Sequence, residues 1–128
     1  MALMTITTSV SEFQNIRDGN KYYVDKSLLI DDLLSKDESG SYLCVRPRRF
    51  GKSMNLSMLD AFFNMRYKGN SWFDGLAISD HHEYDRYRNS FPVVRLDMKD
   101  VSVVDWEGFL SGLGKVIRRS FLDHIDIR

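Results

Sequence analysis

Residues 42–53, Tyr-Leu-Cys-Val-Arg-Pro-Arg-Arg-Phe-Gly-Lys-Ser, decide which fold this sequence predicts. An apolar run comes first, a basic turn follows, and a segment with helical spacing of apolar side chains begins at Lys52. This order of strand, turn and helix is typical of the phosphate-binding loop G-x-x-x-x-G-K-[ST]. The sequence departs from that motif at Arg46, which stands where the first glycine is expected.

The end of this stretch has the residue types that phosphate binding needs. Backbone N–H groups and the positive end of the following helix together attract an anion. Gly51 would allow the backbone to approach a phosphate closely, Lys52 would reach the β- and γ-phosphates, and the Ser53 hydroxyl would coordinate Mg²⁺. Pro47 fixes its own φ and favours extended backbone at Arg46, which alters the loop's shape. The alternative is a connection with a solvated basic turn.

The overall composition does not call for nucleic acid or an anionic membrane as a partner. The 128 residues include 18 Lys+Arg and 18 Asp+Glu, so the formal net charge is zero and any basic function is local. Cys44 is the only cysteine, which excludes an intrachain disulfide and a multi-cysteine metal site. The sequence has neither a signal-peptide pattern nor an apolar run of the ~18 residues that a membrane span requires. We therefore expect a cytoplasmic location.

The spacing of apolar residues predicts alternating strands and helices. We expect strands at residues 22–24, 42–45 and 91–98, and helices over residues 26–34, 52–65 and 105–124. Strands separated by helices indicate a parallel sheet covered by helices. The predicted fold is therefore α/β, a partial P-loop NTPase of three layers with a parallel sheet flanked by helices. Residues 1–128 form the N-terminal part of one such domain in this interpretation, with residues 1–10 as a lead-in.

Four segments, in this order along the chain, resemble the AAA-ATPase-like family of bacterial and archaeal proteins. They are residues 22–27, 46–53, 73–78 and 91–97, within a resemblance that covers about residues 11–125. The family itself carries the replaced first glycine, so Arg46 agrees with the resemblance. The resemblance implies ATP and Mg²⁺ as ligands. Because longer members commonly carry a C-terminal restriction-endonuclease-like nuclease domain, it also implies such a domain, or another C-terminal region of a longer parent, as a partner.

The resemblance assigns nucleotide contacts to the loop and to two residues before it. The candidate nucleotide-binding residues are Arg46, Pro47, Arg48, Arg49, Phe50, Gly51, Lys52, Ser53, Met54, Tyr23 and Asp25. Arg48 and Arg49 either stack on the base or contact phosphate, or they pair with carboxylates of the remaining part of the larger domain. Tyr23 either stacks on adenine or is a core tyrosine. Asp25 either lines the nucleotide entrance or caps a helix.

The resemblance also implies a Walker B strand, ending in an acidic pair, after the last helix. The sequence shows no such strand before Arg128, so we expect this chain to be the N-terminal portion of a larger domain. Asp97 is the strand-end carboxylate nearest to the expected place, and it either faces the phosphates or forms a structural turn. Lys52 and Asp97 are therefore the catalytic candidates, and hydrolysis is expected in the complete parent.

Three functions are compatible with these residues. The first is an ATP- and Mg²⁺-binding module of a P-loop ATPase. The second is a non-hydrolysing module that senses nucleotide or binds a protein, with the nucleotide ordering the loop. The third is a nucleic-acid-binding domain that uses Arg46, Arg48, Arg49 and Arg66, which zero net charge disfavours. A second copy of the chain is a further expected partner, since unpaired strands and apolar faces seek one.

Overall fold

The computed structural model describes residues 4–6, 10–36, 40–43, 45, 51–81, 83–99, 101 and 104–123. The chain divides into two compact units, Met1–Pro92 and Val93–Arg128. Each unit has its own helices and is described by itself.

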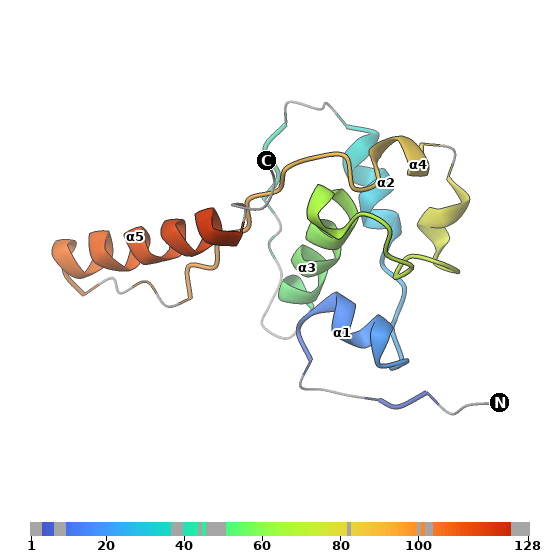
Figure 1. The fold of residues 1–128 in the computed structure, drawn as a ribbon, viewed down its shortest axis with the longest axis horizontal. Helices are drawn as coiled ribbons and strands as arrows, with labels where there is room; N and C mark the ends of the chain where they lie inside the picture. The colour runs from blue at the N-terminus through green and yellow to red at the C-terminus, as the bar shows by residue number, and fades with distance from the viewer. Residues whose placement is uncertain are drawn as a thin grey trace. The chain divides into compact units, whose positions relative to one another are not determined.

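Short helices build the first unit, and Figure 1 shows them along the chain. Its elements are α1 (Phe13–Asp18), α2 (Leu28–Leu34), α3 (Lys52–Phe63), the 3₁₀ helices η1 (Met65–Tyr67) and η2 (Ala77–Asp80), and α4 (Tyr84–Tyr87). The second unit contains α5 (Trp106–Asp123). The three longest helices agree with the sequence prediction, and α3 begins at Lys52 as expected.

The predicted parallel sheet is wrong for the part of the chain that the structure describes. In those residues the only β pairings are isolated bridges, Thr5 with Lys21 and Asn64 with Phe91. A strand forms only where a neighbouring strand completes its hydrogen bonds, and an apolar pattern does not supply that neighbour. Leu43 is accordingly 89% exposed. The three-layer α/β arrangement is therefore replaced by packed helices and irregular segments.

The segment predicted as the strand 91–98 shows where its hydrogen bonds go instead. The N–H of Phe91 donates to the carbonyl of Phe63 at 3.0 Å, and the Phe91 carbonyl accepts from the N–H of Met65 at 2.8 Å. Phe91 is thus bound to the chain that leaves α3. Among the described residues, the bridge between Phe91 and Asn64 is isolated and does not extend into a strand.

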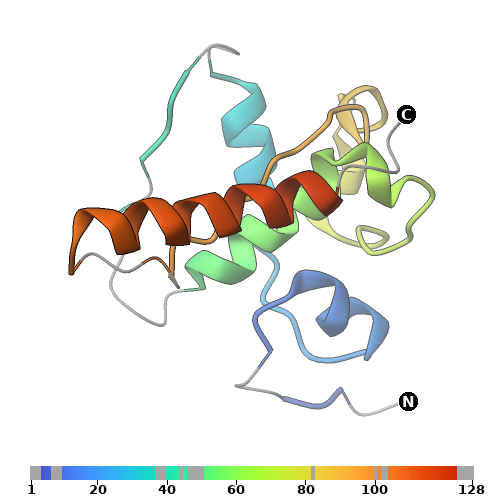
Figure 2. The ribbon, with the colours of Figure 1, turned by 60° about the vertical axis from the view of Figure 1, so that its left-hand side comes forward.

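An aromatic core surrounds α3. The rings of Phe13 and Phe73 lie 4.9 Å apart, and Phe62 meets Phe73 edge-on at 5.3 Å. All three side chains are fully buried. Met58, which lies on α3 like Phe62, is also fully buried. Figure 2 shows α1 next to α3, and a hydrogen bond of 2.9 Å from the Phe13 N–H to the buried Ser57 hydroxyl joins the two helices. Aromatic packing therefore fixes the position of α3.

The last turn of α3 is closed by a side chain 25 residues or more away in sequence. The amide of Asn89 donates to the carbonyls of Ala61 at 2.9 Å and Asn64 at 2.7 Å. Its backbone N–H donates to the Phe62 carbonyl at 2.6 Å. Asn89 is buried and has a φ of 49°, in the left-handed region that asparagine tolerates better than most residues. It therefore satisfies carbonyls that a helix end leaves unpaired.

The second unit carries an apolar pocket. Val94, Leu96, Ile117 and Phe121, with Ser120, line a cavity of about 250 Å³ between the segment that follows residue 93 and α5. Trp106 is exposed and stacks on Phe109 with ring centroids 5.9 Å apart.

In the described part of the chain, none of the helices has both the length and the apolar character to cross a membrane.

The Asn89 contacts predict a strong effect of substitution. Asn89→Gly keeps the left-handed backbone accessible but removes the amide, leaving two buried carbonyls without their donor. We expect it to lower the free energy of unfolding by about 2 kcal/mol. Asn20→Gly is the control, because Asn20 has a φ of 48° but is exposed. It should change stability by less than ~0.5 kcal/mol. Urea denaturation measures both, and equal effects would contradict the role given to the Asn89 amide.

Candidate functional site

The start of α3 presents the residues of the phosphate-binding motif. Gly51 precedes the helix with φ 78° and ψ 23°, a left-handed conformation that glycine adopts without strain. Its carbonyl accepts the N–H of Asn55 at 2.9 Å, so the helical ladder begins at this residue. Lys52 and Ser53 are exposed, and Met54 packs against the core. The first turn of α3 contains no acidic residue, which keeps the positive end of the helix suited to an anion.

The five residues before Gly51 lie outside the described part of the chain. They are Arg46, Pro47, Arg48, Arg49 and Phe50. Their assigned nucleotide contacts therefore stay predictions, including both alternatives for the two adjacent arginines.

A second lysine lies at the start of α3. A Cβ placed on Gly51 would be 3.5 Å from the Nζ of Lys26, so that ammonium lies beside the residue that begins the helix. Lys26 is not among the site residues predicted from the sequence. The available signal was its place inside residues 22–27, one of the four segments that resemble the family.

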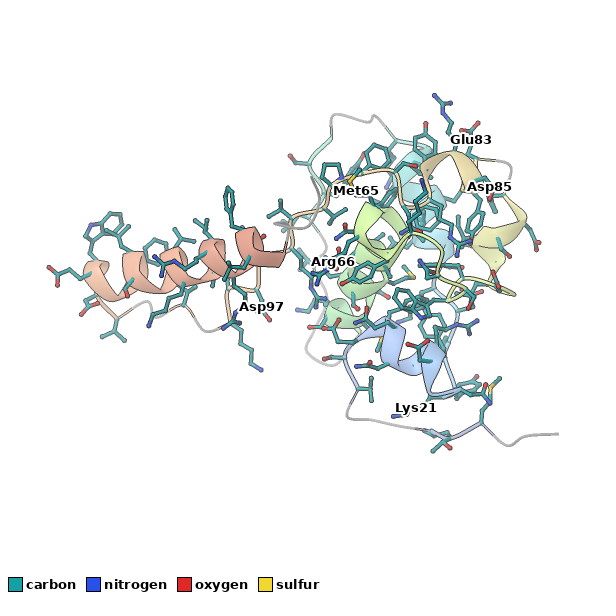
Figure 3. All side chains as sticks on the ribbon, viewed as in Figure 1. Lys21, Met65, Arg66, Glu83, Asp85 and Asp97 are labelled. Carbon is teal, nitrogen blue, oxygen red and sulfur yellow. The ribbon has the colours of Figure 1, made fainter. Side chains whose placement is uncertain are left out.

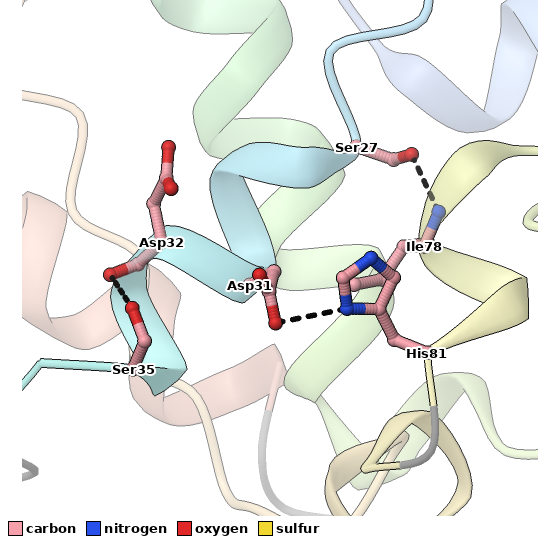
Figure 4. Close-up of polar contacts among 6 residues, drawn as sticks. All are labelled: Ser27, Asp31, Asp32, Ser35, Ile78 and His81. Atoms are coloured by element: carbon pink, nitrogen blue, oxygen red, sulfur yellow. Dashed lines mark hydrogen bonds and ion pairs between the residues drawn. The ribbon is translucent and has the colours of Figure 1, made fainter.

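Hydrogen bonds join residues 22–27 to residues 73–78. Asp25 Oδ2 accepts the N–H of Ala77 at 2.8 Å, and Asp25 Oδ1 accepts the N–H of Ser27 at 2.8 Å. The fully buried Ser27 accepts the N–H of Ile78 at 3.1 Å, the contact drawn in Figure 4. Two segments that resemble the family therefore form one structural joint, in which Asp25 binds backbone. Its place at a nucleotide entrance stays a prediction.

The same joint sets the protonation of Asp25. Partial burial would raise the pKa of this carboxyl group. The Ser27 hydroxyl and the N–H groups of Ala77 and Ser27 donate to the carboxylate and outweigh that effect, with the Arg17 charge adding to them. The net result is a pKa below the usual value for aspartate. The carboxylate form of Asp25 is therefore the one that the fold stabilises.

A further contact binds η2 to α2. His81 Nδ1 lies 3.0 Å from Asp31 Oδ1, as Figure 4 shows. With the contacts of Asp25 and Ser27, this pair holds η2 against α2 and the residues before it.

Tyr23 packs in the core of the first unit. Its hydroxyl donates to the sulfur of Met58 at 3.2 Å, and its ring meets Phe13 edge-on at 5.3 Å. Burial raises the pKa of the Tyr23 hydroxyl. These contacts agree with the core alternative, and stacking on adenine stays a prediction.

Asp97, the second catalytic candidate, lies in the second unit and is labelled in Figure 3. Its Oδ1 accepts the N–H of Lys99 at 3.0 Å, a local turn on an exposed segment. Since Lys52 belongs to the first unit, a catalytic pair of Lys52 and Asp97 stays a prediction. Among the described residues, no group of three or more His, Cys, Asp or Glu side chains is placed to hold a metal ion.

Comparison with known proteins identifies the family of this chain. Glycine, lysine and serine at the start of a helix are what ATPases of the P-loop class carry. Residues 7–124 match the family described as Predicted AAA-ATPase, and the chain belongs to this AAA-ATPase-like family.

The chain is also similar to a curated protein from Azotobacter chroococcum mcd 1. That protein is described as "Uncharacterized protein in vnfD 5'region", and the two are 34% identical over 98 residues, which cover 75% of this chain. The match spans 17% of the length of the relative. No solved structure matches the chain.

The lowered pKa of Asp25 predicts a pH dependence of stability. A depressed folded-state pKa stabilises the fold above the unfolded value of about 4, and this stabilisation is lost as the pH falls through the folded value. Asp25→Asn should therefore lower the urea midpoint at pH 7. The difference from the unsubstituted chain should narrow below about pH 4.

Asp32→Asn is the control for this prediction, because Asp32 is an exposed aspartate on α2. Asp32→Asn should leave the urea midpoint unchanged at pH 7 and at pH 3. A gap between Asp25→Asn and the unsubstituted chain that stays constant from pH 7 to pH 3 would contradict the prediction.

Proposed function

We propose that this chain binds ATP with Mg²⁺ at the start of α3. The observation that carries the proposal is Gly51, left-handed and followed by Lys52 and Ser53 on the first turn of the helix, in a chain of the AAA-ATPase-like family. The exposed first turn without acidic side chains supports an anionic ligand. This motif binds nucleoside triphosphates in P-loop proteins, and the family of this chain is described as a predicted ATPase.

Each residue of this turn has a separate part in binding. The N–H groups of the first turn have no partner within the helix and are free to bind a phosphate. The left-handed conformation of Gly51 sets the direction in which the backbone enters this turn. Lys52 contributes an ammonium that binds phosphate oxygens as a point charge. The Ser53 hydroxyl is the proposed protein ligand for Mg²⁺, which neutralises phosphate charge when bound.

Hydrolysis is proposed for the complete parent protein, since the matched residues cover 17% of the length of the relative. Asp97 is proposed as a carboxylate of that reaction. A nuclease domain or another region of the parent, and a second copy of this chain, are the proposed macromolecular partners.

The proposal predicts that Lys52→Ala weakens ATP binding by at least ~10-fold, because a charge-assisted hydrogen bond to phosphate is lost. Isothermal titration of the chain with ATP and MgCl₂ measures the change. Lys68→Ala is the control, because Lys68 is also an exposed lysine but follows η1, beyond the opposite end of α3. The proposal fails if the unsubstituted chain does not bind ATP or if Lys52→Ala binds as well as the control.

A pair of glycine substitutions tests the conformation of the site. Gly51 and Gly69 have φ values of 78° and 88°, so alanine at either position should cost about 1–2 kcal/mol of stability. An added Cβ meets only an ordinary contact at Gly51 and nothing within 4 Å at Gly69, so neither change creates a clash. Only Gly51→Ala should weaken ATP binding, since only that residue orients the N–H groups of α3. Equal affinities of the two variants in the same titration would refute this role.

A further inference from the structure

Lys26 brings a second positive charge to the start of α3 from a distant part of the sequence. Its Nζ lies within an ordinary contact distance, 3.5 Å, of the position that a Cβ on Gly51 would take. Lys52 is the next residue along the chain from Gly51. One lysine thus precedes α2 and the other begins α3, and both side chains are exposed.

The backbone on both sides of Lys26 is held in place. Asp25 is bound to the N–H of Ala77 and Ser27 to the N–H of Ile78, both at the start of η2. The carbonyl of Lys26 itself accepts the N–H of Leu29 at 3.1 Å as α2 begins. The ammonium of Lys26 therefore lies beside the start of α3 on a side chain whose backbone is fixed. Fixing the backbone reduces the entropy that is lost when the side chain binds a ligand.

The charges at this point favour an anion of more than one negative charge. The positive end of α3 and the ammonium of Lys52 already attract a phosphate. The ammonium of Lys26 adds a further cation at the same end of the helix. We propose that Lys26 is a second phosphate-binding lysine of this site, which selects nucleoside di- and triphosphates over monophosphates. This inference rests on the proposed function and adds to it the residue that recognises the length of the phosphate chain.

The experiment compares the affinities of ATP, ADP and AMP, each with MgCl₂, for the full chain and its Lys26 variants. Lys26→Gln removes the charge, Lys26→Met removes it but keeps the aliphatic stem, and Lys26→Arg keeps it. Lys68→Gln is the matched loss of one exposed positive charge elsewhere. Urea midpoints of all variants are measured in parallel.

We expect Lys26→Gln and Lys26→Met to weaken ATP and ADP binding by ~10-fold, the effect of one lost charge-assisted hydrogen bond. Binding of AMP should change by less than about threefold, and Lys26→Arg should keep ATP affinity within about threefold. The ATP affinity of the two neutral variants should also fall less steeply with added salt, because one screened charge is missing.

Two results would overturn the inference while leaving the proposed function intact. One is that Lys52→Ala loses ATP but Lys26→Gln and Lys26→Met bind like Lys68→Gln. The other is an equal loss for ATP and AMP, which would place Lys26 away from the outer phosphates. If the unsubstituted chain binds none of the three nucleotides, both proposals fall. If Lys26→Gln has a lower urea midpoint, the ATP affinities of Lys26→Met and Lys26→Arg are compared instead, because both retain an aliphatic stem. Equal ATP affinities of these two variants would then overturn the inference.

Discussion

The joint between residues 25–27 and the start of η2 is the constraint on which the arrangement of the site depends. The N–H of Ala77 donates there to the side chain of Asp25, and the N–H of Ile78 donates to the side chain of Ser27. Ser27 is fully buried. The buried hydroxyl of Ser27 would be costly without a partner, so its bond to Ile78 favours one position for the chain before α2. The bond of the exposed Asp25 to Ala77 adds to this restraint. That position brings the side chain of Lys26 beside Gly51.

Helix α3 connects this joint to the rest of the first unit. Its first residues form the proposed phosphate site, its middle contributes Met58 and Phe62 to the aromatic core, and its end is closed by the amide of Asn89. Because core packing and a side-chain cap fix the helix independently of its first turn, the exposed residues Lys52 and Ser53 are available for a ligand. The middle and the end of the helix thus contribute to stability, and the exposed side chains of Lys52 and Ser53 are proposed to contribute to binding.

Local patterns predicted the helices well and the sheet badly. The helices expected at 26–34, 52–65 and 105–124 are found within two residues as α2, α3 and α5, because the backbone bonds of a helix are local. Strands need partners from elsewhere in the chain, which alternation of apolar residues does not specify. The segment predicted as a strand from Phe91 shows this, since its first residue is instead bound to the end of α3.

The sequence by itself determined the motif Gly51-Lys52-Ser53, its position at the start of a helix and the membership of the chain in its family. These depend on residue types at short spacing, where dihedral freedom and local hydrogen bonds dominate. Only the tertiary structure decided that Asp25 binds the backbone of η2, that Tyr23 packs on Met58, and that Lys26 reaches Gly51. Such contacts join segments that lie far apart along the chain, and they follow from packing and polar satisfaction across the whole unit.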